Sequence, residues 1–433
     1  MTPVDIGYIC IGILVVTLFT GIPIAFALPL VGTIGIYWIS GPEAAFSMLI
    51  RDFYEVWTAY PLTVITMFVL MGSYAFAVGI GSRSYDTCHK VFGHLPGGLA
   101  IAAVAAATAF GAVCGSAAAT AATIGKVTLP EMRKYGYNDS LSTGIVASAG
   151  GIGILIPPSS VFIVYGVITE QSIGKLFISG IGPGLLLAGL FTVAVLLECY
   201  HDPAIAPRGP RVSMKTKLLS LVGIVDALVL FGVTMGGLFS GWFTPTQAGA
   251  IGAGGALIIG AVTRQLNWQN FLAATKEGVV ISCMVLSLIA GATVFGHFLA
   301  MSTLTAALVD WMLRLSLPPW GVMSIVFIVF FVGGCLCDTM PLVIILVPLF
   351  FPVITKLGYD PIWFGAVIVL LAGVGLVTPP VGVNAFIING MTGVPLEKIF
   401  RGAAPFVAGY VLTILLISLF PWIATFLPSI ITY

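Results

Sequence analysis

The sequence predicts an all-α polytopic membrane protein that contains two copies of one unit in inverted orientation. Of its 433 residues, 59% are hydrophobic and only 8% are charged, whereas about a quarter of the residues in a soluble globular protein are charged. Apolar stretches exceed the roughly 20 residues that a spanning helix needs. Because backbone polar groups in hydrocarbon must be paired within the chain, these stretches are expected to be helices in a lipid bilayer. The net charge of +1 argues against a nucleic-acid partner.

The second observation behind this prediction is an internal repeat of residues that interrupt helices. Both copies contain Gly-x-Gly followed by Pro-Pro in apolar sequence, and the two copies lie 222 residues apart, as from Gly153 to Gly375. Paired interruptions of this kind are the best sequence pointer to the binding site of a secondary transporter. Other matched pairs are Pro23 with Pro245, Gly111 with Gly333, Pro130 with Pro352, Lys134 with Lys356, Gly180 with Gly402 and Pro183 with Pro405.

Apolar runs between helix-breaking residues predict the elements of the first copy, residues 1–199. Residues 97–134 are too long for one untilted span and contain Gly115 and Ser116, so we expect a re-entrant hairpin with its tip there. Residues 140–168 are expected to be a broken helix, because successive prolines remove donors and clash with the preceding turn. The other expected elements are helices at 6–20, 22–39, 62–80 and 175–199 and an amphipathic stretch at 46–58.

The second copy, residues 217–433, is expected to repeat this order. A hairpin is predicted at 319–356 with its tip at Asp338 and Thr339, followed by a broken helix at 361–390. The other expected elements are helices at 217–240, 244–263, 278–300 and 402–427, an amphipathic stretch at 267–277 and a surface stretch at 303–317.

Basic segments predict the orientation of the chain, because they favour the cytoplasmic side of a membrane. The polar segment 200–216, which includes Arg208 and Arg211, is the expected cytoplasmic linker, and the segment from Arg83 to His94 is expected to be a basic loop on the same side. Each copy then makes an odd number of net crossings, so the second copy is inverted and both termini are extracytoplasmic. No basic residue precedes Arg51, so the first segment is expected to remain as a helix and not to be cleaved as a signal peptide.

The interrupted helices are the expected binding sites for ions, because their ends leave backbone groups without partners. Carbonyl groups lose their partners where one half-helix ends, and N–H groups lack partners where the next begins. Carbonyl ends suit a small cation and N-terminal ends suit an anion, so two related cation sites beside one anion site are expected. The candidate residues are Ser116, Gly153, Ile156, Pro157, Ser159 and Ser160 in the first copy and Asp338, Thr339, Gly375, Thr378 and Asn384 in the second.

Each polar candidate also has a simpler interpretation. Asp338 is a candidate for cation binding because a carboxylate at membrane depth is costly, but it could cap its own helix. The Thr378 hydroxyl could contact a ligand or sodium, or cap its helix. Ser159 and Ser160 could contact substrate or act as N-caps. Asn384 could face substrate or form an interhelical hydrogen bond.

Other polar features have no expected part in chemistry. Asp226 is expected to form a local pair, and His297 is expected to pack rather than to relay protons. Gly125 and Lys126 resemble a fragment of a phosphate-binding loop, but Val127 follows and the required earlier glycine is missing. No enzyme is predicted. Because no nucleotide-binding motif is found, the chain is not expected to encode an ATP-driven pump, and the energy for transport is expected to come from an ion gradient.

The runs from Gly153 to Ser159, from Gly375 to Asn384 and from Gly333 to Asp338 together resemble the DctM-like large membrane subunit of tripartite ATP-independent periplasmic (TRAP) transporters. The resemblance covers essentially the whole chain. It implies a sodium-coupled elevator transporter of the ion-transporter superfamily in the bacterial inner membrane. It further implies one sodium site at Ser116 with the backbone from Gly153 through Ile156 to Pro157, and another at Asp338 with Gly375 and Thr378. The residues expected to contact the substrate are Ser159, Ser160, Thr339 and Asn384.

The same resemblance implies two partners. One is a small four-helix DctQ-like membrane subunit, and the other is a periplasmic DctP-like binding protein that delivers a small organic anion, either a carboxylate or a sulfonate. Some members fuse the two membrane subunits, but this chain begins at the first large-subunit helix, so the small subunit is expected to be a separate polypeptide. The alternatives are a stand-alone ion-coupled symporter or antiporter of the same superfamily, and a non-transporting membrane scaffold or channel.

Overall fold

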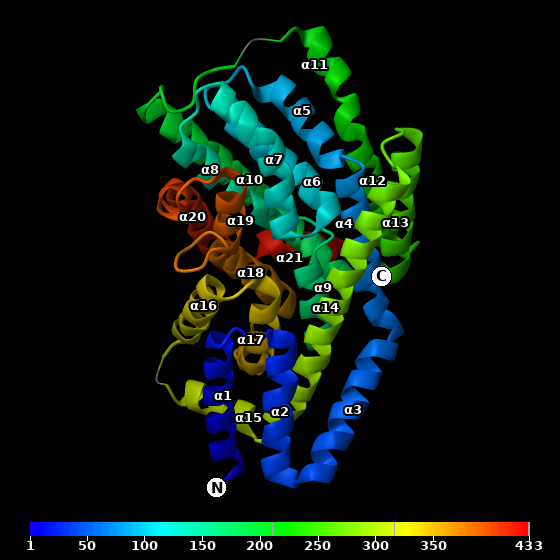
Figure 1. Ribbon diagram of the computed structural model, residues 1–433. Coiled ribbons are helices and arrows are strands. Elements are labelled where there is room, and N and C mark those ends of the chain that lie inside the picture. Colours follow the sequence, from blue (N-terminus) through cyan, green and yellow to red (C-terminus); the bar gives the residue numbers. More distant parts are fainter. Residues whose placement is uncertain (210–211, 316, 432–433) are drawn as a thin grey trace.

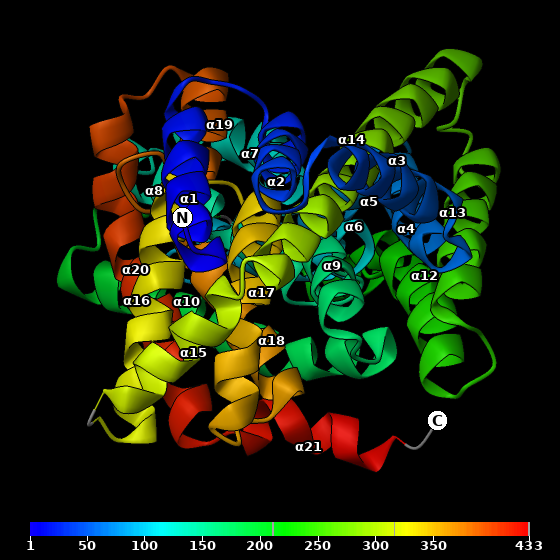
Figure 2. The same cartoon turned by 90° about the horizontal axis from the view of Figure 1, so that it is seen from below.

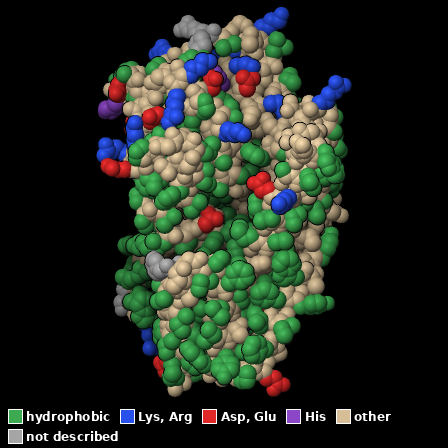
Figure 3. Space-filling model, viewed as in Figure 1, with side chains coloured by type: hydrophobic (Ala, Val, Ile, Leu, Met, Phe, Trp, Pro, Cys, Tyr) green, Lys and Arg blue, Asp and Glu red, His purple; other side chains and the backbone are tan. Residues whose placement is uncertain are grey.

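The computed structural model describes residues 1–209, 212–315 and 317–431, which form a bundle of helices (Figure 1). Eight helices within these ranges are long and apolar enough to cross a membrane. Hydrophobic side chains cover much of the visible surface, while Lys and Arg side chains gather at its upper end (Figure 3). The predicted all-α membrane fold is confirmed, although the linker residue Arg211 lies outside the described residues.

The first copy follows the predicted order of elements with one correction. The segment from Arg83 to His94 was expected to be a loop, but most of it is helical, because Ile80, Tyr85 and Cys88 bury one face of an amphipathic helix. The elements are α1 (Pro3–Phe19), α2 (Ile24–Ser40), α3 (Pro42–Thr58), η1 (Tyr60–Leu62), α4 (Thr63–Ala77), α5 (Ile80–Phe92), α6 (Gly98–Cys114), α7 (Ala117–Lys134), α8 (Asp139–Gly150), η2 (Gly151–Ile154), α9 (Ser160–Thr169) and α10 (Ile173–His201).

The second copy differs from its predicted elements in two places. The stretches 267–277 and 278–300 form one helix, because Cys283 occupies the repeat position at which Pro61 interrupts the first copy. The expected helix 402–427 is divided near Pro421. The elements are α11 (Met214–Ser220), α12 (Val222–Phe239), α13 (Pro245–Val262), α14 (Trp268–Met301), α15 (Leu304–Arg314), α16 (Pro319–Leu336), α17 (Thr339–Lys356), α18 (Pro361–Gly375), α19 (Val383–Thr392), α20 (Leu396–Leu419) and α21 (Trp422–Ile430).

The two copies run in opposite directions through the molecule. The hairpin α6–α7 descends from the upper end in Figure 1, whereas α16–α17 lies in the lower half, near α1 and α15. Helices α12 and α13 lie on one side of the bundle, and α16 and α20 lie on the other, in both views (Figures 1 and 2). The inverted repeat with two hairpins and two interrupted helices is therefore present. The division into residues 1–199, 200–216 and 217–433 follows this order and remains a prediction.

Glycine contacts join each hairpin to the interrupted helix of its own copy. A Cβ atom added to Gly111 of α6 would lie 2.6 Å from the Cα atom of Gly153. A Cβ atom added to Gly375 of α18 would lie 2.3 Å from the carbonyl oxygen of Gly334 in α16. Real Cβ atoms essentially never approach so closely, so both contacts require glycine. The repeated glycines therefore let the hairpins reach the helix interruptions.

Two ion pairs connect helices outside the hairpins. Arg83 Nη2 of α5 lies 2.7 Å from Asp226 Oδ2 of α12, so Asp226 is paired with a residue of the other copy rather than locally. His297 Nδ1 of α14 lies 2.7 Å from Oδ2 of the buried Asp52 of α3. Asp226 and His297, for which the sequence predicted no part in transport, thus each have a partner that stabilises helix packing.

The crossing of α8 and α20 provides a test of this close packing. A Cβ atom at Gly402 would lie 1.8 Å from the Ser140 carbonyl oxygen, whereas one at Gly236 of α12 would meet nothing within 4 Å. We expect Gly402→Ala to lower the free energy of unfolding by about 1 to 3 kcal/mol through overpacking, and Gly236→Ala to leave it unchanged or slightly raised. Thermal unfolding of the detergent-solubilised protein measures both, and equal stability of the two variants would contradict the described crossing.

Candidate functional site

A cavity of about 210 Å³ lies where the two hairpin tips face helices α4 and α14. Ser116 and Ser160 of the first copy and Asp338 and Thr339 of the second line this cavity. The structure therefore brings predicted residues of both copies to one place. Helices α4 and α14 contribute Phe68, Gly72, Phe76, Glu277, Ile281 and Met284 to the opposite wall.

Three helix N-termini converge on the cavity. Its lining includes Ala117 in the first turn of α7, Ser160 at the start of α9 and Thr339 at the start of α17. The first N–H groups of a helix have no intrahelical acceptor and give that end a partial positive charge, which favours a bound anion. The described lining residues include the acids Asp338 and Glu277 but no Lys, Arg or His. An anion in this cavity would therefore depend on backbone dipoles and on any cation bound beside it.

Each hairpin tip is closed by a capping side chain. Ser116 Oγ accepts a hydrogen bond from the Ala119 amide at 3.4 Å, and Asp338 Oδ1 accepts one from the Thr339 amide at 2.8 Å. Within the described residues, Asp338 Oδ2 accepts no hydrogen bond. Asp338 thus caps α17 and also presents a carboxylate to the cavity, so its two predicted roles do not exclude each other.

The tip of the first hairpin is attached to the first helix interruption. Ser160 Oγ donates a hydrogen bond to the Gly115 carbonyl oxygen at 3.1 Å, and a Cβ atom at Gly115 would lie 2.4 Å from the Pro158 carbonyl oxygen. Ser159 is fully buried, and its hydroxyl accepts from the Phe162 amide at 3.4 Å. Ser160 therefore lines the cavity, whereas Ser159 caps α9 and does not line it.

Thr120 is a candidate that the sequence analysis missed. Its Oγ1 atom is buried and has no hydrogen-bond partner within the described residues. A Cβ atom at Gly153 would lie 2.5 Å from this Oγ1 atom and 3.4 Å from the Ser116 carbonyl oxygen. Only the absence of a side chain at Gly153 leaves space between these oxygens. The one available sequence signal was that Thr120 lies one helical turn after Ser116.

The interruption in the second copy is attached to the second hairpin. The Val381 amide donates to the Cys335 carbonyl oxygen at 3.2 Å. The Thr378 hydroxyl donates to the Val374 carbonyl oxygen at 2.7 Å. Thr378 thus bonds to the last turn of the preceding helix α18, and neither it nor Gly375 lines the cavity.

The remaining predicted residues are also outside the cavity lining. Asn384 is fully buried, and its Nδ2 atom donates to the Ala147 carbonyl oxygen of α8 at 2.9 Å. This bond joins α19 of the second copy to the first copy. Pro157 is buried, and Ile156 faces α10, where a Cβ atom at Gly184 would lie 2.7 Å from its Cγ1 atom.

The two Pro-Pro segments have different surroundings. Pro157 and Pro158 are buried, whereas Pro379 and Pro380 are exposed. The first interruption is therefore enclosed beside the cavity, while the prolines of the second lie at the molecular surface. The cavity is not symmetric between the copies in this conformation.

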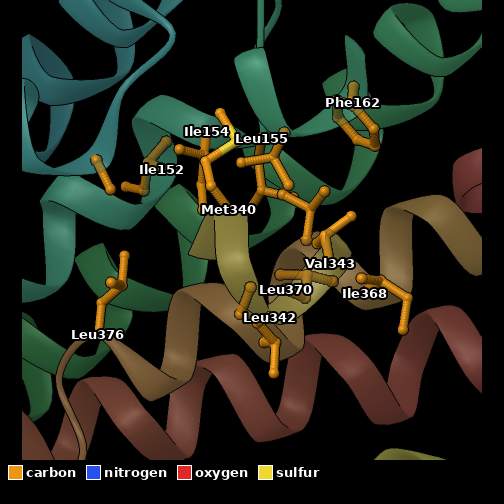
Figure 4. Packing of buried hydrophobic residues seen from close by; sticks show 14 of the residues in the cluster. Ile152, Ile154, Leu155, Phe162, Met340, Leu342, Val343, Ile368, Leu370 and Leu376 are labelled. Atoms are coloured by element: carbon orange, nitrogen blue, oxygen red, sulfur yellow. The ribbon is translucent and has the colours of Figure 1, made fainter. Parts of the chain in front are cut away.

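Apolar packing joins the second hairpin to the first interruption. Figure 4 shows Met340 of α17 beside Ile154 and Leu155, with Val343 and Leu370 packed next to them. Met340 and Ile154 also line the cavity, while Leu155 is fully buried. This contact between the copies keeps the tip of α16–α17 next to the broken helix of the first copy.

Oppositely oriented hairpins whose tips meet a broken helix inside an apolar bundle define the inverted-repeat class of secondary transporters. Sequence comparison identifies the family within this class. The family described as "Tripartite ATP-independent periplasmic transporter, DctM component" matches residues 11–423, so the chain belongs to the DctM family of TRAP transporter subunits. It is a multi-pass membrane transporter subunit and not an enzyme.

Known relatives agree with this assignment. The chain is 36% identical over 389 residues to the C4-dicarboxylate TRAP transporter large permease protein DctM of Pseudomonas aeruginosa, with 90% of each chain covered. It is 32% identical over 429 residues to the isethionate TRAP transporter permease protein DctMQ of Oleidesulfovibrio alaskensis, covering 99% of this chain and 65% of that protein. The solved structure of the Alcanivorax borkumensis YdaH transporter has a similar fold, with a TM-score of 0.59 at 17% identity over 89% of this chain and 90% of that one.

The bond between Ser160 and Gly115 can be tested without a transport assay. We expect Ser160→Ala to remove about 1 kcal/mol from the attachment of the first hairpin tip, which corresponds to roughly fivefold faster amide hydrogen exchange in the first turns of α7. Ser324→Ala is the control, because that hydroxyl bonds only to the Trp320 carbonyl oxygen of its own helix. Unchanged exchange at the tip in the Ser160→Ala variant would show that this bond does not hold it.

Proposed function

We propose that this chain imports a small organic anion together with sodium, as the large membrane subunit of a TRAP system in the bacterial inner membrane. The observation that carries this proposal is the cavity in which three helix N-termini meet two carboxylates. Such a site attracts an anion and a cation together, because each reduces the electrostatic cost of the other.

The anionic group of the substrate binds at the N-termini of α7, α9 and α17. Carboxylate and sulfonate oxygens both accept hydrogen bonds from backbone N–H groups. The names of the two relatives described above, a C4-dicarboxylate and an isethionate transporter subunit, support these two chemical classes for the present chain. None of the described residues that line the site has a basic side chain, so the backbone N–H groups and bound sodium supply the positive charge.

Sodium binds at two sites, and oxygen atoms are its ligands at both. The first lies around Gly153, where the Thr120 hydroxyl and the Ser116 carbonyl oxygen both border the space that a side chain would fill, with carbonyls from Ile156 and Pro157 as further ligands. The second lies at Asp338, with Gly375 and Thr378 supplied by the interrupted helix. Sodium next to Asp338 offsets the carboxylate charge that would otherwise repel the substrate.

The moving unit in this proposal is built from both copies. The Asn384–Ala147 bond joins α19 to α8, and Asp139 pairs with Arg133 at 3.3 Å and with Lys398 at 3.5 Å. These contacts support joint movement of α6–α9 with α16–α20. Helices α4 and α14 lie across the cavity and belong to the stationary scaffold, together with α13, which packs along α4. An elevator movement would then carry the cavity past α4 and α14.

Two partners complete the system. A small DctQ-like membrane subunit accompanies this chain, and a periplasmic DctP-like protein delivers the anion to it. The end at which Lys and Arg side chains gather (Figure 3) faces the cytoplasm, because basic segments favour that side. The N-terminus, at the opposite end of the molecule in Figure 1, then lies on the periplasmic side, and we propose the same side for the C-terminus.

Replacing the carboxylate in the cavity tests sodium coupling. In proteoliposomes with the small subunit and the binding protein, we expect Asp338→Asn to reduce sodium-driven uptake of a carboxylate or sulfonate by at least about tenfold, because it removes the charge that attracts sodium. Asp310→Asn, on the exposed face of α15, is the matched control and should retain uptake. Wild-type uptake that continues when potassium replaces sodium would contradict the coupling.

Thr120 allows a second test at constant side-chain shape. Thr120→Val should raise the sodium concentration for half-maximal uptake by roughly five- to tenfold, since loss of one hydroxyl ligand costs about 1 kcal/mol. Thr128→Val is the control, because Thr128 lies on the same helix and also has a buried hydroxyl without a partner in the described chain, but it is more than three helical turns from Ser116. Equal sodium dependence of the two variants would remove Thr120 from the site.

A further inference from the structure

A second cavity adjoins the first. It has a volume of about 590 Å³ and is lined by residues of α4, α5, α7 and α14. Phe76 and Glu277 line both cavities, so the two spaces meet at these side chains. The other residues around the second cavity include Ser82, Thr123, Lys126, Asn270, Ala273 and Ala274.

The second cavity lies nearer to the basic end of the molecule than the first. Along α7, residues up to Ala122 line the first cavity and Thr123 to Val127 line the second. This helix continues to Lys134, and in Figure 1 it runs from the middle of the molecule toward the upper end. Along α14, which descends from the upper part of the figure, the second cavity begins at Asn270 and the first extends to Val285. The two cavities thus follow each other in the direction of the Lys and Arg side chains.

Two side chains of opposite charge, those of Lys126 and Glu277, face the second cavity. Neither Lys126 nor Glu277 forms an ion pair or a side-chain hydrogen bond with another residue of the described ranges, and both are exposed. Lys126 belongs to the first hairpin, whereas Glu277 belongs to α14 on the other side of the boundary. An unpaired charge at membrane depth is costly unless it faces water or a ligand. The second cavity is therefore suited to hydrated ions of both signs.

We propose that the second cavity is the release route to the cytoplasm, in which Lys126 attracts the departing organic anion and Glu277 attracts the departing sodium. This inference rests on the proposed function and adds the exit path and its charged residues. Lys126 reduces the barrier for an anion that leaves the N-terminal turn of α7, because it lies further along the same helix. Glu277 borders both cavities, so it can receive the cation from the first one directly. Both side chains position ions along the route, and Glu277 also borders the first cavity.

Charged thiol reagents test the electrostatics of this route without requiring transport. Ala273→Cys places a thiol in the second cavity, in a Cys283→Ser background because Cys283 is exposed. We expect Lys126→Met to slow modification by a sulfonate-bearing methanethiosulfonate and to accelerate modification by its trimethylammonium analogue, each by about two- to tenfold. Glu277→Gln should have the opposite effect on both reagents. Lys134→Met, at the end of the same helix, should change neither rate, and rates that do not respond to Lys126 or Glu277 would overturn the assignment.

Transport by the complete system tests whether ions follow this route. Modification of Ala273→Cys in proteoliposomes that contain the small subunit and the binding protein should block substrate passage. Lys126→Met should lower the rate of passage at least fivefold and leave the affinity for substrate within about twofold, whereas Lys126→Arg should restore the rate. Uptake is first measured with the unmodified protein. If the proposed function is wrong, the unmodified protein shows no uptake. Uptake that survives complete modification would instead overturn the release route alone.

Discussion

The structure depends on how it satisfies backbone groups that lose their helical partners inside an apolar bundle. At each hairpin tip, a side chain caps the returning helix, Ser116 in one copy and Asp338 in the other. Glycine contacts then bring each hairpin against a broken helix. These contacts concentrate unpaired N–H and carbonyl groups in one small region, where a polar ligand can replace the missing partners.

The two copies contribute unequally to this region. The first copy supplies an enclosed interruption, the Ser160–Gly115 bond and the Thr120 hydroxyl, which has no hydrogen-bond partner among the residues that the structure describes. The second copy supplies the carboxylate of Asp338, while its own Pro-Pro segment is exposed. Duplication therefore created the pair of hairpins, and sequence divergence gave one of them a charge. The proposed site for an anion and cations depends on this asymmetry, since a carboxylate at both tips would repel the anion more strongly than a carboxylate at one.

The repeat was readable from sequence because helix interruption is a local property of Gly and Pro. Local signals did not show that α14 is one continuous helix. The matching helix of the first copy is interrupted at Pro61, whereas the second copy has Cys283 at that position. Local signals also did not show that the basic segment at Arg83 forms an amphipathic helix. Ser116 and Asp338 were found because polar residues at hairpin turns are conspicuous in apolar sequence. Thr120 and Glu277 were missed, because their positions beside Gly153 and at the cavity depend on helices distant in the chain.

The central claim is that an organic anion binds where the N-terminal turns of α7, α9 and α17 converge. A cryo-electron microscopy map of this chain with its small subunit, sodium and a transported carboxylate tests it most directly. The account predicts density for the anionic group within hydrogen-bonding distance of backbone N–H groups in these turns. Ordered substrate density elsewhere in the protein, with these three helix ends in contact with no part of it, would contradict the account.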